Sequence, residues 1–300
     1  MPMGELASLL TSVLYAATAV IFTRAGRRVG SPTVNLVRLL VALPGMVLLH
    51  LAVAGSLFPA HAGLVRFAWL GASGLIGFAL GDALLFEAYL LAGPRLTVLV
   101  FTLWPVFAAV LAWLFLGQAM TPAKVAAMLV TLGGIALVVS EPGQAGSPQP
   151  SRSGHSGLGL LLGAGAAAGQ AAGFILAKVG MAGGYSPVSA NLVRVSAGVL
   201  SLGGWQVLRR QLVPNLARLQ DRRAGALIAL GALLGPVIGV VLSLYAVSHA
   251  LSLGVASTLM SLSPVLLLPV ARAVDQERVT SRALVGTLVC MGGVGALFFV

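Results

Sequence analysis

The sequence predicts an all-helical membrane protein built from two related halves, and three observations support this fold class. The 300-residue chain is 58% hydrophobic and only 8% charged, whereas about 25% of residues are charged in an ordinary soluble domain. Its apolar residues form runs of the length that a membrane-spanning helix needs, about 20 residues. Motifs of the first half also recur, in the same order, in the second half.

Ten apolar runs are candidate transmembrane helices. Their approximate limits are 4–23, 33–54, 67–92, 96–116, 123–140, 158–180, 187–208, 224–249, 253–272 and 283–300. A segment at 141–157 is rich in Gly, Pro, Ser and Gln, which is typical of a flexible linker. We therefore expect a first five-helix unit at 1–140, the linker at 141–157, and a second five-helix unit at 158–300, with a central cavity between the units.

The internal repeat consists of short matched motifs on either side of the linker. The pairs are Ser31-Pro32 with Ser186-Pro187, Asn35 to Arg38 with Asn191 to Arg194, Phe86 with Tyr245, Trp104-Pro105-Val106 with Ser263-Pro264-Val265, Gly117-Gln118 with Gln276-Glu277, Thr121 with Thr280, and Gly133-Gly134 with Gly292-Gly293. From Phe86 onward these pairs keep one constant offset. Repeats of this kind are a signature of transporter folds.

Five spans per half is an odd number, so the second half is expected to enter the membrane upside down relative to the first. The basic residues agree with this expectation. The connection after the first span holds Arg24, Arg27 and Arg28 but its counterpart only Lys178, and the connection after the second span holds Arg66 but its counterpart Arg209, Arg210, Arg218, Arg222 and Arg223. By the positive-inside rule the connections after odd-numbered spans are cytoplasmic, which places both termini outside.

The remaining composition argues against other classes of function. The net charge of +11 is dispersed between apolar runs, which favours lipid headgroups over nucleic acid as its partner. With one cysteine, Cys290, there is no disulfide framework and no Cys-based metal site. The four histidines lie at span ends or in linkers without metal-binding spacing, so we expect neither a cofactor nor an intramembrane enzyme. A membrane receptor or assembly protein would call for a soluble domain, and the connections are short.

Taken together and in order, these motifs resemble the drug/metabolite transporter superfamily, specifically its ten-span members built from two EamA-type domains. The resemblance is carried by the Ser-Pro and Arg38 or Arg194 entries to the second span of each half, Gly81-Asp82, Gly93-Pro94-Arg95, the Pro-Val pairs and the closing Gly-Gly motifs. Gln118 departs from it, because the family usually has Gly-Glu there. So does the predicted topology, because the family is described with both termini in the cytoplasm.

The resemblance implies an exporter or permease for a small metabolite, amino acid or drug-like molecule in the plasma or inner membrane. The leading hypothesis is alternating-access transport around a site at the midplane, with export as the expected direction. An uncoupled facilitator is the alternative within the same class.

Asp82 is the first candidate for the transport chemistry. An acidic side chain inside a span costs about 2.5–3.5 kcal/mol on insertion scales, which indicates a purpose. A carboxyl that gains and loses a proton there would couple proton flow to substrate movement. The alternative is a structural salt bridge, for example to Arg38. Glu87 lies on another face, nearer the membrane boundary, where it would reach water or pair with Arg95.

Arg38 and Arg194 occupy equivalent positions that the inverted repeat directs to opposite sides of the membrane. They would bind an anionic group of the substrate as paired gates, or extend to phosphate headgroups. Asn35 and Asn191, one turn earlier, are expected to cap their helices.

Three further groups complete the candidates. Pro105 and Pro264 would kink equivalent spans and expose backbone to the cavity, unless they are packing kinks. The aromatic residues Trp104, Phe86, Tyr89 and Tyr245 would line the cavity or face lipid. The small residues Gly133, Gly134, Gly292 and Gly293 predict close packing of the fifth span against the tenth.

Overall fold

The computed structural model describes residues 3–116, 120–139, 156–249, 259–267 and 280–296, and this part of the chain is helical without a strand. The first half comprises α1 (Met3–Val29), α2 (Ser31–Ala54), η1 (Ala60–Ala62), α3 (Leu64–Gly74), η2 (Leu75–Gly81), α4 (Asp82–Leu91), α5 (Gly93–Phe101), α6 (Trp104–Leu116) and α7 (Pro122–Val139). Helices α3 and α4 form one continuous span through η2, which is a π-helical turn.

The second half repeats this order. It comprises α8 (Ser156–Gly180), α9 (Pro187–Leu208), α10 (Leu212–Ala217), η4 (Arg218–Gln220), α11 (Arg222–Ala232), η5 (Leu233–Gly239), α12 (Val240–His249) and α15 (Ser281–Ala296), with helical turns at 259–260 and 263–267. Like η2, the segment η5 is a π-helical turn that joins two helices into one span.

Within the described part of the chain, six helices are long and apolar enough to cross a membrane: Met3–Val29, Ser31–Ala54, Leu64–Leu91, Gly93–Phe115, Gly157–Gly180 and Arg222–Ala246. Pro122–Val138 and Ser281–Ala296 are shorter apolar helices. The predicted span at 253–272 lies mostly outside the described residues, so the count of ten stays a prediction.

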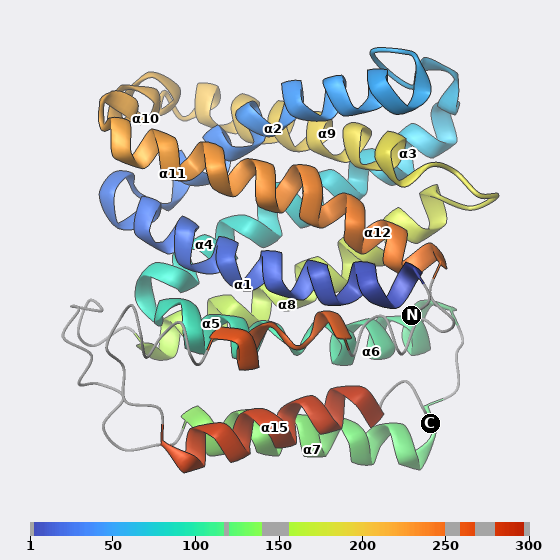
Figure 1. Cartoon of the computed structure of the whole chain (residues 1–300), viewed down its shortest axis with the longest axis vertical. Helices are drawn as coiled ribbons and strands as arrows, with labels where there is room; N and C mark the ends of the chain where they lie inside the picture. Colours follow the sequence, from blue (N-terminus) through green and yellow to red (C-terminus); the bar gives the residue numbers. More distant parts are fainter. Residues whose placement is uncertain (1–2, 117–119, 140–155, 250–258, 268–279, 297–300) are drawn as a thin grey trace.

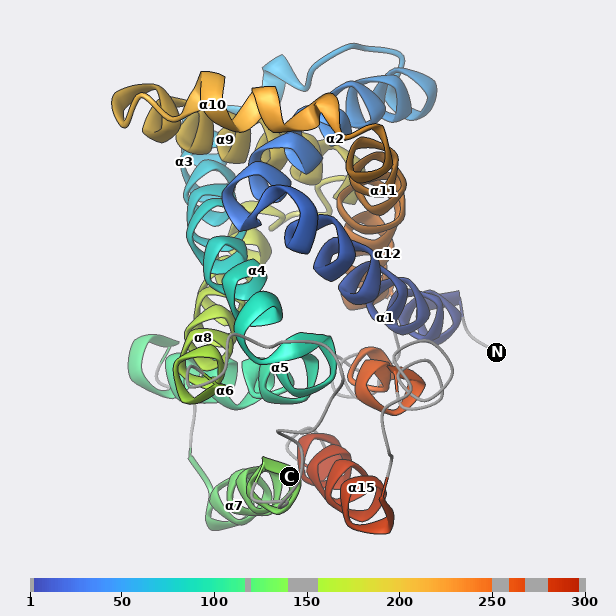
Figure 2. The same cartoon turned by 90° about the vertical axis from the view of Figure 1, so that its left-hand side faces the viewer.

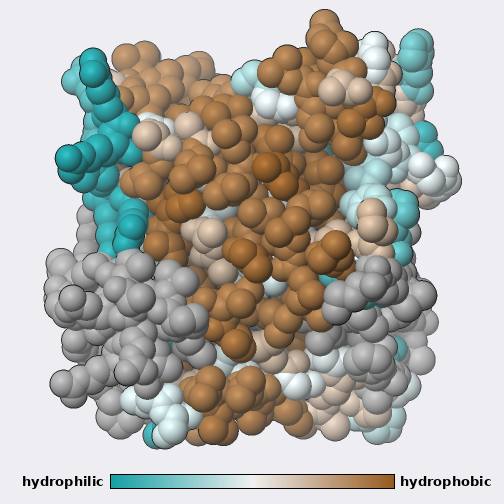
Figure 3. Space-filling view, viewed as in Figure 1, coloured by the Kyte–Doolittle hydropathy of each residue, from teal (hydrophilic) through white to brown (hydrophobic). Residues whose placement is uncertain are grey.

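The outer surface is apolar to a degree that fits lipid rather than water. Leu64, Leu161, Leu200 and Phe115 are among many large apolar side chains that are exposed, and Figure 3 shows a broad hydrophobic band across one face of the molecule. Soluble monomers rarely expose continuous apolar patches beyond a few hundred Å². The chain is therefore a multi-pass membrane protein.

Equivalent helices of the two halves lie antiparallel wherever they meet. The carbonyl of Pro32, at the start of α2, accepts a hydrogen bond from Gln206 near the end of α9, and His50 near the end of α2 bonds Ser189 at the start of α9. The α7–α15 pair at the bottom of Figure 1 is antiparallel as well. The two halves therefore run in opposite directions.

The halves also exchange partners. Helix α1 packs on α11 and α12, and its repeat equivalent α8 packs on α3, η2 and α4. Figure 2 shows the α3–α4 span with α8 on one side and α1 with α11–α12 on the other, closed above by α2 and α9 and below by α5 and α6. This arrangement leaves the centre of the molecule bounded by both halves.

Candidate functional site

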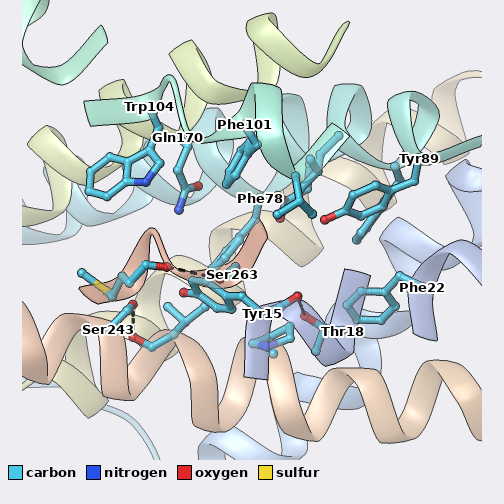
Figure 4. A pocket seen from close by; sticks show the side chains of 18 of the residues that line it. Tyr15, Thr18, Phe22, Phe78, Tyr89, Phe101, Trp104, Gln170, Ser243 and Ser263 are labelled. Atoms are coloured by element: carbon cyan, nitrogen blue, oxygen red, sulfur yellow. Dashed lines mark hydrogen bonds between the residues drawn. The ribbon is translucent and has the colours of Figure 1, made fainter. Parts of the chain in front are cut away.

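A cavity of about 120 Å³ lies between the halves. Both halves contribute to its walls, and aromatic side chains dominate them (Figure 4). The lining residues are Tyr15, Thr18, Phe22, Arg38, Phe78, Asp82, Leu85, Phe86, Tyr89, Val98, Phe101, Thr102, Trp104, Gln170, Phe174, Gly235, Pro236, Val240, Ser243, Met260, Ser261 and Ser263.

One wall of the cavity holds a buried ion pair. Nη2 of Arg38 donates to Oδ2 of Asp82, and Nε and Nη2 of Arg38 donate to Oδ1 of Asn35 at 3.2 and 3.0 Å. Its guanidinium carbon lies 4.8 Å from the ring centroid of Phe86. Arg38 is only 3% exposed, and a buried charge is tolerated when its hydrogen-bonding groups are matched in this way. The structure thus forms the Arg38–Asp82 salt bridge that the sequence offered as one of two alternatives.

Arg194, the repeat equivalent of Arg38, has no such acidic partner among the described residues. It is 1% exposed, and among the described residues its Nε and Nη1 have no hydrogen-bond partner. Its guanidinium carbon lies 4.8 Å from the ring centroid of Phe78. The asymmetry comes from the residue that follows each π-helical turn, which is Asp82 after η2 and Val240 after η5.

The two asparagines bind the π-helical turns instead of capping their helices. Asn191 donates to the carbonyl of Pro236 at 2.7 Å, and Asn35 donates to the carbonyl of Ala79 at 3.4 Å. A π-helical turn displaces carbonyl groups from the regular i−4 ladder, so these oxygens need other donors. The expectation of caps was wrong because the sequence gives little warning of a π-helical turn.

The predicted breaks before the two prolines occur at matching positions. Helix α5 ends at Phe101 and α6 begins at Trp104, where the Leu103 N–H donates to Val100 at 3.0 Å. The same turn recurs in the second half, where the Leu262 N–H donates to Leu259 at 3.2 Å. The cavity is lined by the residues just before the prolines, which are Thr102, Trp104, Ser261 and Ser263, and not by Pro105 or Pro264 themselves.

The predicted aromatic residues divide between the cavity and its surroundings. Trp104 lies against Phe174, with ring centroids 5.4 Å apart, and Phe86 lies against Phe22 at 5.1 Å. Tyr245 does not line the cavity; it stacks on His249 near the end of α12. Counted from the starts of α4 and α12, the residue that corresponds to Phe86 is Leu244. Tyr245 is one residue further on, and thus rotated by about 100°.

Glu87 lies outside the cavity and accepts a hydrogen bond from Ser31. Of the predicted glycines, only one of each pair lies in the contact between α7 and α15. A Cβ on Gly134 would lie 2.3 Å from the nitrogen of Cys290, and one on Gly293 would lie 2.5 Å from the nitrogen of Thr131. Gly133 and Gly292 face open space.

Several lining residues were absent from the sequence-based candidates, notably Tyr15, Phe78, Gln170, Phe174 and Ser243. A usable signal existed for Phe78, because Gly77 and Gly81 occupy the same places in the first π-helical turn as Gly235 and Gly239 in the second. The others stand on apolar helices where no local pattern distinguishes the inner face.

Antiparallel helical halves that enclose polar and ionised groups between them define a class of membrane protein, the secondary transporters with inverted repeats. The chain belongs to the EamA-like transporter family, whose profile matches residues 2–140 and again 157–299. A crystal structure of another protein matches 99% of this chain and 97% of its own, at 17% sequence identity and a TM-score of 0.62, which shows a shared fold. No curated protein matches the chain.

Proposed function

We propose that this chain carries a small molecule across the cell membrane by alternating access, with the central cavity as its binding site. The supporting observation is the burial of Arg38, Asp82 and Arg194 between two antiparallel halves. Ionised groups inside a bilayer are costly and mark substrate or ion pathways. The family to which the chain belongs consists of transporters rather than enzymes, and inverted repeats are the arrangement on which alternating access is built in secondary transporters.

Alternating access requires contacts between the halves to open at one end while they hold at the other. At the basic end, Arg218 of the second half donates to the carbonyl of Val29, and Arg28 pairs with Asp221. At the opposite end, Arg66 donates to the carbonyl of Gly180, and His50 bonds Ser189. We propose that these two sets break in turn as the halves rock around the cavity.

The proposed orientation places the basic end in the cytoplasm and both termini outside. Arg27 and Arg28 end α1, and the arginines around α10 and α11 lie at the same end of the bundle. Anionic lipid headgroups of the cytoplasmic leaflet favour this placement. Fluorescent or phosphatase tags on the two termini test this orientation. Tags that report both termini in the cytoplasm would show that the orientation is the opposite of the one proposed. The proposed direction is export, which follows from the family resemblance and is measured as net efflux.

We further propose that Asp82 couples transport to protons, because it is the acidic group on the cavity wall and its carboxylate is shared with Arg38. The Asp82→Asn variant in proteoliposomes tests this coupling. Coupling predicts that the variant no longer concentrates substrate when a pH difference is imposed. A variant that still concentrates substrate would show that Asp82 is not the coupling group, and a wild type that never concentrates substrate would be an uncoupled facilitator.

Alternating access itself is testable before the substrate is known. In a Cys290→Ala background, we would place single cysteines at Ser243 or Thr18, which line the cavity, and at Leu200, which is 75% exposed on the apolar surface. A membrane-impermeant thiol reagent is then applied to right-side-out and inside-out vesicles.

A transporter predicts labelling of the cavity cysteines from both sides, while the cysteine at 200 stays unlabelled because it faces lipid. Labelling from one side only, unchanged by any condition, would favour a receptor or assembly protein over a transporter.

A further inference from the structure

The charges around the cavity do not balance. Arg38 and Asp82 neutralise each other in the buried ion pair, and Arg194 adds a second guanidinium. Among the described residues that line or adjoin the cavity, Asp82 is the one acidic side chain. The described residues around the cavity therefore carry one net positive charge inside a low-dielectric region, where an uncompensated charge is costly.

Arg194 is held where it stands. Its backbone carbonyl lies so close to Gly74 that a Cβ there would come within 2.2 Å of the oxygen. Its side chain extends along η2, with Nη2 3.5 Å from the position of a Cβ on Gly77. A fully buried arginine on a fixed backbone cannot extend to a phosphate headgroup, which removes the alternative role that the sequence left open.

The ring of Phe78 connects this charge to the cavity. Phe78 lines the cavity, and its ring centroid lies 4.8 Å from the guanidinium carbon of Arg194 and 5.6 Å from that of Arg38. Figure 4 shows the ring between the side chains of the two walls. An acid group bound beside Phe78 would be attracted by Arg194, because the charge of Arg38 is offset by Asp82, and the edge of an aromatic ring carries partial positive charge as well.

We infer that the cavity selects small organic monoanions, whose acid group is attracted to Arg194 beside Phe78 and whose ring or branched alkyl body lies among the aromatic side chains. This inference rests on the proposed transport function and names its substrate class. The cavity of about 120 Å³ is smaller than the apolar cavity of about 150 Å³ that holds benzene, so it restricts the body of the ligand to a small ring or branched alkyl group. Trp104, Phe101 and Phe22 supply the apolar surface for such a body.

The aromatic walls alone would also suit an organic cation, since cations bind over ring faces. The charge count opposes that occupant. The carboxylate of Asp82 is already engaged by Arg38, so a cation would meet a net positive site. The acid group of an anion, in contrast, would be attracted by the nearby guanidinium of Arg194, whose Nε and Nη1 have no hydrogen-bond partner among the described residues.

Three probes of nearly equal shape and different charge test the inference: benzoate, benzamide and benzylamine. Their binding to the purified full-length protein in detergent is measured by calorimetry and by the shift of the melting temperature. We expect benzoate to bind at least tenfold more tightly than benzamide, and benzylamine to bind more weakly than either. This comparison uses the wild-type protein and needs no variant.

Variants then test whether Arg194 supplies the positive charge that attracts the acid group. Arg194→Gln should weaken benzoate binding roughly 10- to 100-fold, as the loss of one nearby opposite charge in a low-dielectric site does, and should leave benzamide binding unchanged. Arg194→Lys should retain part of the preference because it keeps the charge. Arg209→Gln also removes one arginine, but from a position stacked on Trp205 outside the cavity, and should bind benzoate as the wild type does.

Equal binding of benzoate and benzamide, preferential binding of benzylamine, no binding of benzoate, or benzoate binding that survives Arg194→Gln would each overturn the inference. None of these results bears on the labelling of cavity cysteines from both sides. Two-sided labelling without anion preference would leave the transporter in place and remove only its proposed substrate class.

Discussion

The contact between α7 and α15 offers a quantitative test of the packing, because neighbouring glycines have opposite surroundings. On Gly134→Ala, the new Cβ would lie 2.3 Å from the Cys290 nitrogen and 2.7 Å from the Gly286 oxygen. Both atoms belong to the backbone, so no side chain can rotate away. Ordinary contact begins at 3.4 Å, which requires the two helices to separate locally by about 1 Å.

The cost of such overpacking is about 1–3 kcal/mol of unfolding free energy. Gly133→Ala is the matched control, because its Cβ meets nothing within 4 Å. Alanine is the better helix former by up to about 1 kcal/mol, so this variant should be neutral or slightly more stable. The second half provides an independent copy, in which Gly293→Ala is expected to destabilise and Gly292→Ala is not.

The assay is reversible unfolding of the purified protein in mixed micelles, followed by circular dichroism. The alanine variants of Gly134 and Gly293 should lose much more stability than the alanine variants of Gly133 and Gly292. If Gly134→Ala and Gly133→Ala unfold at the same denaturant concentration, the close approach of α7 to α15 is not as described, and the reasoning from backbone contact fails.

Three further predictions concern the site and its surroundings. Asp82→Asn leaves the buried charge of Arg38 without its partner and should cost about 3–5 kcal/mol in the same assay, and the double variant with Arg38→Gln should recover most of this loss. Asn191→Leu leaves the Pro236 carbonyl unpaired and should cost about 1–3 kcal/mol; a variant as stable as the wild type would contradict the role assigned to this asparagine. Asp221 accepts a hydrogen bond from the side chain of Arg28 on α1 and from backbone N–H groups at the start of α11. These hydrogen bonds lower the pKa of Asp221. Its stabilising effect should therefore be complete above the unfolded pKa of about 3.9 and lost as the pH falls through the lower folded value, so Asp221→Asn should melt below the wild type at pH 7 and approach it near pH 3.

Much of the architecture could be predicted from the sequence, because the responsible signals are local. Low charge and long apolar runs indicate a membrane protein whatever the helices contact. The repeat consists of short motifs such as Ser-Pro followed by an arginine, and these motifs indicate the family without any knowledge of how the helices pack. Asp82 and Arg38 stood out because ionised groups within apolar runs are expensive wherever they point.

Other features required the tertiary structure. Whether Arg38 or Arg194 would hold Asp82 depends on which helices meet, and the sequence treats the two arginines as equivalent. The inner face of each span depends on the π-helical turns, since one extra residue rotates everything beyond it by about 100°. The sequence motifs align Phe86 with Tyr245, whereas the starts of α4 and α12 align it with Leu244, so Phe86 lines the cavity while Tyr245 does not.

Residue type and order along the chain thus determined that this protein lies in a membrane, that it has two related halves, and which ionised groups it buries. Only the packing of the helices decided which of those groups pair, which face the cavity, and that Arg194 has no acidic partner among the described residues. The physical reason is that burial in lipid acts on each residue separately, whereas compensation of charge and of displaced carbonyls depends on partners brought together from distant parts of the chain.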